Sequence, residues 1–272
     1  MAIQVQLEDH TGNQSRQAKM AENAPVARLI PALVTSLGLP ITDPSGRPIS
    51  YRLSHNNRQL MDDETLATAN VQGGDTITIV PEMTAGGSDV PPGSAGAPFV
   101  SLGRIVSDSL PRAGFPPFAA GAAAESEVGV CLAEKALRRL VEHAVRDPTL
   151  EVGGILLGEV YEEGGRHFVF VEDVCEARHV VASCTSLLFT GESWLGMLID
   201  RRARPHVKTL GWYHSHPGHG VFMSGIDQFT HQNFFGSRPW YVAIVVDPLA
   251  RDVGAFIWEQ GRLTRAPWIN VL

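Results

Sequence analysis

The sequence has few cysteines, and their spacing argues against two kinds of cross-linked structure. Only three occur in 272 residues, Cys131, Cys175 and Cys184, and no two of them form a Cys-x-x-Cys pair. An odd number without that spacing is typical neither of a disulfide framework nor of a cysteine-ligated zinc knuckle. We therefore expect the chain to work in a reducing compartment, with the cytoplasm as the default location.

A basic excess and a long apolar run are also missing. The formal net charge is −7 at pH 7, so no chain-wide positive surface for nucleic acid is expected. No apolar run approaches the ~20 residues of a membrane-spanning helix. The first residues, MAIQVQLEDH, lack the basic region and apolar core of a signal peptide. We expect a globular chain whose partners include neither nucleic acid nor a membrane.

Composition divides the chain into two patterned segments and a linker. Residues 84–126 are rich in Gly, Pro, Ala and Ser, as flexible linkers are. We predict a first domain over residues 1–87, a linker over 88–126 and a second domain over 127–272. The apolar stretch at residues 99–110 is unusual for a tether, and it is compatible with docking on a domain or with a transient local cluster.

The first segment alternates short strand-like and helix-like patterns. Apolar and polar residues alternate from Ile3 to Leu7, which suits a half-buried strand. After Pro25 the apolar residues fall at helical spacing until Gly38, where a helix end is expected. These patterns predict a helix over residues 25–37 and strands over 3–7, 51–54 and 76–80. This order in so short a span indicates a compact α+β domain.

The run RLSHNNRQLMDDETLATANVQGGDTITIV, from Arg52 to Val80, resembles the second half of ubiquitin without gaps. The resemblance implies the ubiquitin-like β-grasp fold. The tail that follows ends in Gly86-Gly87, the pair that ubiquitin-like modifiers use for conjugation. The chain departs from ubiquitin at Ser54, which occupies the position of a central apolar residue in ubiquitin's interaction patch.

The second segment mixes strand-like and helix-like patterns over its whole length. We predict helices over residues 132–146 and 192–204, and strands over 153–160, 167–171, 179–188, 207–213, 241–246 and 255–259. This mixture favours an α/β domain with a central mixed sheet flanked by helices.

Two histidines stand at the end of an apolar strand in this second segment. His214 and His216 are two residues apart, and the two-residue period of a strand puts both imidazoles on one face. Pro217 and Gly218 end the strand, and a further helix is predicted to begin at residues 224–227. This turn and helix allow the chain to fold the carboxylate of Asp227 back towards the histidines. Two imidazoles and this carboxylate leave a fourth tetrahedral position open, as in catalytic zinc sites.

The order His-x-His-Pro and then Ser-x-x-Asp, with ten residues between the second histidine and the aspartate, is similar to the JAMM motif of MPN-plus deubiquitinases. That family also has a glutamate at the start of an apolar strand, and Glu151 in EVGGILLG corresponds to it. The resemblance covers about residues 128–258. It implies one zinc ion per chain bound by His214, His216 and Asp227, with Glu151 as acid/base and Ser224 as oxyanion support.

Each of these residues has a simpler interpretation when it is taken alone. The histidine pair fits a strand surface, Ser224-x-x-Asp227 is a helix-capping pattern, and Glu151 fits a strand edge. Their joint occurrence in the family's order favours the metal site and disfavours a non-catalytic scaffold. A zinc nucleoside deaminase is excluded because no Pro-Cys-x-x-Cys accompanies the histidines.

Three neighbouring residues receive lesser roles. We expect His219 to be a solvated loop residue, although contact with substrate is also compatible with its place in the motif loop. His231 follows Asp227 by one helical turn, which allows a supporting contact to the site. Cys175 ends an apolar strand with no activating motif around it, so we expect it to pack in the core.

The JAMM resemblance implies cleavage after the C-terminal glycine of a ubiquitin-like protein. Our main hypothesis is that the chain cuts its own first domain after Gly87, before Ser88, and removes that domain from conjugated targets. Such fusions resemble those of bacterial ubiquitination-like systems, which implies activating-type and conjugating-type enzymes as partners. The alternative is that the first domain is a permanent docking or autoinhibitory module and Gly86-Gly87 is only linker.

Overall fold

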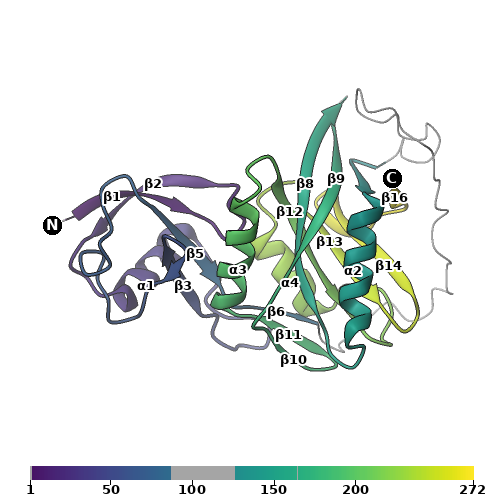
Figure 1. Ribbon diagram of the computed structural model, residues 1–272, viewed down its shortest axis with the longest axis horizontal. Helices are drawn as coiled ribbons and strands as arrows, with labels where there is room; N and C mark the ends of the chain where they lie inside the picture. The colour runs from purple at the N-terminus through teal and green to yellow at the C-terminus, as the bar shows by residue number, and fades with distance from the viewer. Residues whose placement is uncertain (1, 87–125, 164) are drawn as a thin grey trace. The chain divides into compact units, whose positions relative to one another are not determined.

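In a computed structural model the chain forms two compact units (Figure 1). Unit 1 comprises Met1–Thr84, Ala177–Val181 and Leu188–Arg204, and unit 2 comprises Ala85–Glu176, Ala182–Leu187 and Pro205–Leu272. The structure describes residues 2–86, 126–163 and 165–272. Nearly all of the predicted linker, including the apolar stretch 99–110, lies outside the described residues, so the predicted domain boundaries stay predictions.

Unit 1 contains a five-stranded sheet in the order β2-β1-β5-β3-β4, with the N- and C-terminal strands β1 and β5 parallel at its centre. The other neighbouring pairs are antiparallel. The elements are β1 (Ala2–Glu8), β2 (Ser15–Ala21), α1 (Val26–Leu37), β3 (Tyr51–His55), β4 (Arg58–Gln59) and β5 (Thr76–Pro81). This is the predicted β-grasp arrangement. The pattern missed β2, since its only buried side chain is Met20.

Helix α1 begins and ends where the sequence predicts. Pro25 precedes it, and Gly38 follows it with a left-handed backbone whose N–H donates to the carbonyl of Thr35. Val26, Leu29 and Val34 are buried on one side of the helix, as the apolar spacing requires.

Residues 179–188 do not form the single strand predicted for them. They contribute two short strands, β10 (Val181–Ala182) and β11 (Ser186–Phe189), which join β6 (Met83–Gly86) in a three-stranded sheet of order β10-β11-β6. The N–H of Ser183 donates to the carbonyl of Ser186 at 2.8 Å and closes a turn between them. The sequence analysis predicted one continuous strand here and did not predict the turn.

Unit 2 is built on an eight-stranded mixed sheet of order β15-β14-β13-β12-β8-β9-β7-β16. The pairs β12–β13, β9–β7 and β7–β16 are parallel, and the others are antiparallel. The strands are β7 (Val128–Leu132), β8 (Gly153–Glu163), β9 (Arg166–Glu176), β12 (Lys208–Ser215), β13 (Val242–Asp247), β14 (Asp252–Glu259), β15 (Arg262–Arg265) and β16 (Asn270–Val271), and the helices are α2 (Glu134–Arg146) and α4 (Gly225–Phe234). The predicted central mixed sheet with helices is confirmed.

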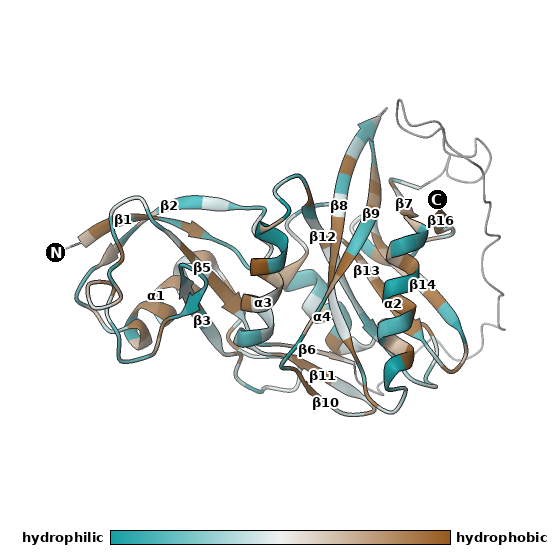
Figure 2. Cartoon of the chain, viewed as in Figure 1, coloured by the Kyte–Doolittle hydropathy of each residue, from teal (hydrophilic) through white to brown (hydrophobic). Residues whose placement is uncertain are grey.

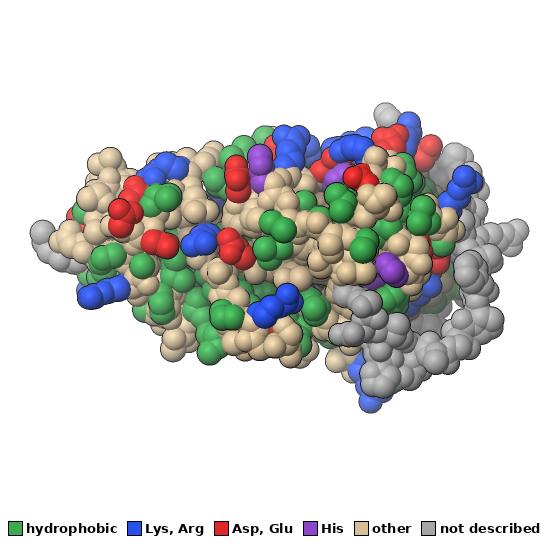
Figure 3. All heavy atoms as spheres, turned by 90° about the horizontal axis from the view of Figure 1, so that it is seen from below, with side chains coloured by type: hydrophobic (Ala, Val, Ile, Leu, Met, Phe, Trp, Pro, Cys, Tyr) green, Lys and Arg blue, Asp and Glu red, His purple; other side chains and the backbone are tan. Residues whose placement is uncertain are grey.

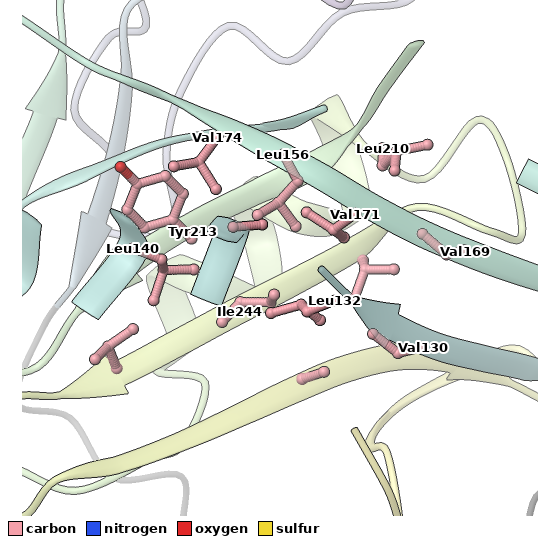
Figure 4. Packing of buried hydrophobic residues seen from close by; sticks show 14 of the residues in the cluster. Val130, Leu132, Leu140, Leu156, Val169, Val171, Val174, Leu210, Tyr213 and Ile244 are labelled. Atoms are coloured by element: carbon pink, nitrogen blue, oxygen red, sulfur yellow. The ribbon is translucent and has the colours of Figure 1, made fainter. Parts of the chain in front are cut away.

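The core of unit 2 lies between α2 and this sheet, where apolar side chains from several strands meet (Figure 4). Helix α2 buries Ala136, Leu140 and Ala144, and β13 is buried along its whole length and coloured as hydrophobic in Figure 2. The helix starts at Glu134 rather than at the predicted residue 132, because Val128–Leu132 pairs as β7 with β9 and β16.

The surface of the described residues carries charges of both signs. Figure 3 shows acidic and basic side chains interspersed on the face seen there. Among the described residues, no helix combines the length and the apolar character needed to cross a membrane.

Strands β12 and β13 approach each other closely at Gly211. A Cβ at this position would lie 1.8 Å from the carbonyl oxygen of Val242, and the Gly211 φ of 146° is one that side-chain-bearing residues rarely adopt. The β12–β8 pairing shifts register between Thr209 and Gly211. The glycine therefore permits the close pairing of β12 with β13 next to the register shift, in the strand that leads to the histidine pair.

We expect Gly211→Ala to lower the free energy of unfolding of unit 2 by about 1–3 kcal/mol or more, because the methyl group must displace backbone and the backbone is strained. Urea denaturation followed by tryptophan fluorescence measures the change. Gly196→Ala is the control, since nothing lies within 4 Å of its Cβ position and it sits inside α3 (Gly191–Arg202). Equal midpoints for the two variants would contradict this account.

Candidate metal centre

The two histidines stand at the end of β12, as predicted. His214 belongs to the strand, and His216 follows it and extends the pairing with β13 by donating its N–H to the carbonyl of Val246 at 2.8 Å. Both side chains are buried. Asp227 reaches them from the first turn of α4, so a strand end and a helix start build the cluster together.

Three metal-binding side chains converge, and one ligand atom of each lies within 4.8 Å of the others. His214 Nε2 and His216 Nε2 are 3.0 Å apart, Asp227 Oδ1 is 3.2 Å from His214 Nε2, and Asp227 Oδ2 is 3.4 Å from His216 Nε2. Ligand atoms about 2.0–2.1 Å from one zinc ion at tetrahedral angles lie about 3.3 Å from each other. The donor set and its spacing therefore fit a tetrahedral zinc ion with one open position.

Ring packing holds the imidazoles in place. The indole of Trp212 stacks on His214 with centroids 4.6 Å apart and planes 10° apart, and Phe222 lies against His216 at 4.7 Å. Neither Nδ1 atom has a hydrogen-bond partner among the described residues. Their orientation thus comes from aromatic contacts rather than from a second hydrogen bond.

Ser224 and Asp227 form a complete capping box at the start of α4. Ser224 Oγ accepts the N–H of Asp227 at 3.1 Å, and Asp227 Oδ2 accepts the N–H of Ser224 at 2.8 Å. The helix-capping interpretation of this pattern and the metal-site interpretation are therefore compatible. The cap fixes the carboxylate at the positive end of the helix, which favours its charged form.

Glu151 is placed beside the histidines by a residue that the sequence analysis did not single out. Ser215, between the two histidines, accepts the N–H of Val152 on its Oγ at 2.9 Å and donates its own N–H to the carbonyl of Val152 at 2.8 Å. Glu151 donates its N–H to the carbonyl of Ser183 at 2.8 Å. The carboxylate is buried, and its Oε2 has no hydrogen-bond partner among the described residues.

Burial and neighbouring charge set the protonation of the cluster. Burial, with the nearby negative charge of Asp227, raises the pKa of Glu151 to about 9. For Asp227, burial alone would raise the pKa, but His214 and His216 outweigh it and hold the pKa well below its usual value. Burial lowers the pKa of His214, which favours the neutral ligand form. Asp227 is therefore an ionised ligand and His214 a neutral one. Glu151 becomes a proton acceptor when a nearby cation lowers its pKa.

Asp247 is a second residue that sequence reasoning missed. It ends β13 and accepts the N–H groups of Gly218 at 2.9 Å and Gly220 at 2.8 Å, and so it holds the loop after the histidine pair. Burial would raise the pKa of Asp247, but the backbone donors outweigh burial and lower it. The sequence offered one sign of this role, a carboxylate directly after an apolar strand, but no motif distinguishes it from other such residues.

The lesser candidates take distinct places. His219 is exposed in the motif loop, as expected. His231 is buried, its Nδ1 accepts the indole N–H of Trp212 at 3.1 Å, and burial lowers its pKa to about 3. It therefore touches the cluster through the indole that stacks on His214. Cys175 is buried in β9, in line with the predicted packing role.

Unit 2 also includes the tail residue Gly86, which lies in this cluster. Its N–H donates to Asp227 Oδ1 at 2.7 Å, and its carbonyl accepts the hydroxyl of Ser224 at 2.7 Å. Gly87 and Ser88, the other two predicted cleavage-site residues, lie outside the described residues. Of the predicted site residues, the structure thus brings together Glu151, Ser224, Gly86 and the three-ligand cluster.

We expect Glu151→Gln to raise the melting temperature of the metal-free chain more at about pH 8 than at about pH 5.5. Between its ordinary pKa of 4.5 and its folded pKa of about 9, Glu151 keeps a proton in the folded chain that the unfolded chain releases, so wild-type stability falls as pH rises through that window. Glutamine escapes this loss. Thermal unfolding with a chelator measures it, with the exposed Glu142→Gln as control, and a gain that is the same at both pH values contradicts it.

Comparisons with known proteins bear on both segments. Residues 133–258 match the family described as prokaryotic homologs of the JAB domain, and residues 3–79 match the family described as WXG100 protein secretion system protein YukD. Among solved structures, Caldiarchaeum Subterraneum Ubiquitin matches 29% of this chain and 92% of its own, at 23% identity and a TM-score of 0.24, which is too low to carry an argument.

Curated relatives match a little under half of this chain. The 26S proteasome regulatory subunit RPN11 of Encephalitozoon cuniculi is 33% identical over 138 residues, 49% of this chain and 45% of the relative. The 26S proteasome non-ATPase regulatory subunit 14 of Drosophila melanogaster is 31% identical over 137 residues, 49% and 43% of the two chains. The COP9 signalosome complex subunit 5 of Caenorhabditis elegans is 33% identical over 133 residues, 44% and 34%.

The match therefore spans less than half the length of these relatives. The family match at residues 133–258 covers the segment that carries the histidine pair, the capping box and the strand after Glu151. Residues 133–258 belong to the JAB (JAMM/MPN) domain family and follow a ubiquitin-like domain at residues 3–79, which confirms both families predicted from the sequence.

Proposed function

We propose that this chain is a zinc-dependent peptidase and isopeptidase that cleaves after the C-terminal glycine of a ubiquitin-like protein, its own first domain included. The observation that carries the proposal is the position of Gly86. Its carbonyl and N–H bond to Ser224 and Asp227, two of the predicted site residues. Similarity to the JAB family supports hydrolase chemistry at the level of the family.

The residues around Gly86 supply the parts of an amide hydrolysis. His214, His216 and Asp227 would hold a zinc ion, which would supply Lewis acidity to lower the pKa of water and polarise a carbonyl. Glu151, buried and without a hydrogen-bond partner on Oε2 among the described residues, takes the proton of the attacking water and gives it to the departing amine. Ser224 donates to the carbonyl oxygen as that oxygen gains negative charge.

Contacts inside unit 1 support the ubiquitin-like domain as the substrate. Helix α3, which lies within residues 133–258, contacts β3, β4 and β5 of the ubiquitin-like sheet. The guanidinium of Arg202 pairs with Glu8 and donates to Thr78 Oγ1 at 2.8 Å and to Asn57 Oδ1 at 3.1 Å. One arginine thus binds side chains from three places on that domain.

The hydrogen bonds of Gly86 to Ser224 and Asp227 also favour a second candidate function. A tail whose carbonyl and N–H are both bound by site residues also occupies the place of any other substrate. A ubiquitin-like domain that is never released would then act as a docking or autoinhibitory module.

In the main proposal the released domain is conjugated to targets in the cytoplasm by activating-type and conjugating-type enzymes.

The deciding experiment is intact mass on the purified full-length chain incubated with one equivalent of zinc. We expect wild type to give an N-terminal fragment that contains the ubiquitin-like domain. We expect no fragment from Glu151→Gln, which lacks the proton carrier, and none from wild type with a chelator, which lacks the Lewis acid. An uncut wild-type chain that nevertheless binds zinc stoichiometrically would favour the docking module and sink self-processing.

A charge-swap series tests the recognition contact. We expect Arg202→Glu and Glu8→Arg each to slow self-processing by about 2- to 5-fold, since a partly exposed ion pair contributes at most about 1 kcal/mol. The double variant restores the pair in reverse and should recover the rate. Arg138→Glu is the charge control, since Arg138 is an exposed residue of α2 that pairs with Glu134 in i,i+4 spacing. Single variants at the wild-type rate would remove this contact from recognition.

A further inference from the structure

The register of the tail in the cluster is fixed by both sides of one residue. Ser224 Oγ, the predicted oxyanion donor, binds the carbonyl oxygen of Gly86 at 2.7 Å, and Asp227 Oδ1 accepts the N–H of the same residue at 2.7 Å. Both hydrogen bonds are buried. A slip by one residue would place a different carbonyl at Ser224 and a different N–H at Asp227.

The cluster also requires glycine at position 86. Gly86 has a φ of 83°, and a Cβ built on it would lie 2.0 Å from Oε2 and 2.6 Å from Oε1 of Glu151. The backbone is therefore in a region that side-chain-bearing residues disfavour, and the space for a side chain is filled by the predicted acid/base. By contrast, the residue before it is Ala85, whose methyl group is accommodated and fully buried.

We infer that the bond hydrolysed is the one that follows the carbonyl carbon of Gly86, one residue before the cut after Gly87 predicted from the sequence. This inference rests on the proposed function. The water oxygen bonds to the Gly86 carbonyl carbon, the carbon–nitrogen bond to the next residue breaks, and Glu151 carries the water's proton to the departing nitrogen. The products are a carboxylate on Gly86 and a new amino terminus on Gly87.

The register defines the class of substrate. The modifier ends in Ala85-Gly86, so the enzyme selects a small residue followed by glycine rather than a Gly-Gly pair. Gly87 then belongs to the leaving group. Both hydrogen bonds are made by Gly86 itself, so the leaving group can equally be a lysine side chain of a conjugated target.

The test is intact mass of the N-terminal fragment from the zinc-loaded full-length chain and from a matched pair, Gly86→Ala and Gly87→Ala. We expect a wild-type fragment that ends at Gly86, at least about a 100-fold slower cut in Gly86→Ala, and a rate within a few-fold of wild type in Gly87→Ala.

The outcomes separate this inference from the proposed function. A fragment that ends at Gly87, with Gly87→Ala blocked, overturns the register and leaves the peptidase proposal standing. A wild-type chain that yields no fragment overturns both.

A second measurement does not depend on turnover. In the full-length Glu151→Gln chain we expect the Gly86 amide to exchange slowly with solvent, because it donates a buried hydrogen bond to Asp227. Ser224→Ala removes the donor to the Gly86 carbonyl and should speed this exchange, whereas the exposed His219→Ala should not. A Gly86 amide that exchanges as fast as in an unfolded chain overturns the register.

Discussion

The candidate site depends above all on the pairing of β8 with β12. Glu151 and the histidine pair are more than sixty positions apart in the sequence, and the antiparallel register that sets His214 opposite Gly153 brings them together. Ser215 locks this register at the strand ends, since its hydroxyl and its N–H both bond to Val152. A one-residue slip would turn the side chains of β8 to the other face of the sheet and shift Glu151, which precedes β8, relative to the histidines.

The start of α4 serves two purposes with the same atoms. Asp227 Oδ2 closes the capping box on the N–H of Ser224, while Oδ1 faces His214 and the tail glycine. A carboxylate at a helix N-terminus is stabilised in its charged form, and that form is the one a metal binds. The helix cap therefore fixes in advance the ligand that completes the cluster, and it fixes the Ser224 hydroxyl beside it.

Substrate, product and inhibitor would meet the same contacts here. The hydrogen bonds from Ser224 and to Asp227 hold the Gly86 carbonyl and N–H, and neither bond depends on the atoms beyond that carbonyl. A cleaved tail would therefore keep most of the interactions of an uncleaved one. In the proposed reaction, release of the product would then depend on the rest of the ubiquitin-like domain, including the pairing of Arg202 with Glu8 in unit 1.

The sequence by itself determined both fold families and the cluster members, because each depends on local order: helical spacing before Gly38, period-two histidines, and Ser224 three positions before Asp227. It did not reveal β2, the turn within residues 179–188, Ser215 or Asp247, whose roles arise from pairing with distant backbone. Only the tertiary structure decided that the Gly86 carbonyl meets Ser224, since two adjacent glycines are equivalent in the sequence until the surroundings of the Gly86 Cα are known.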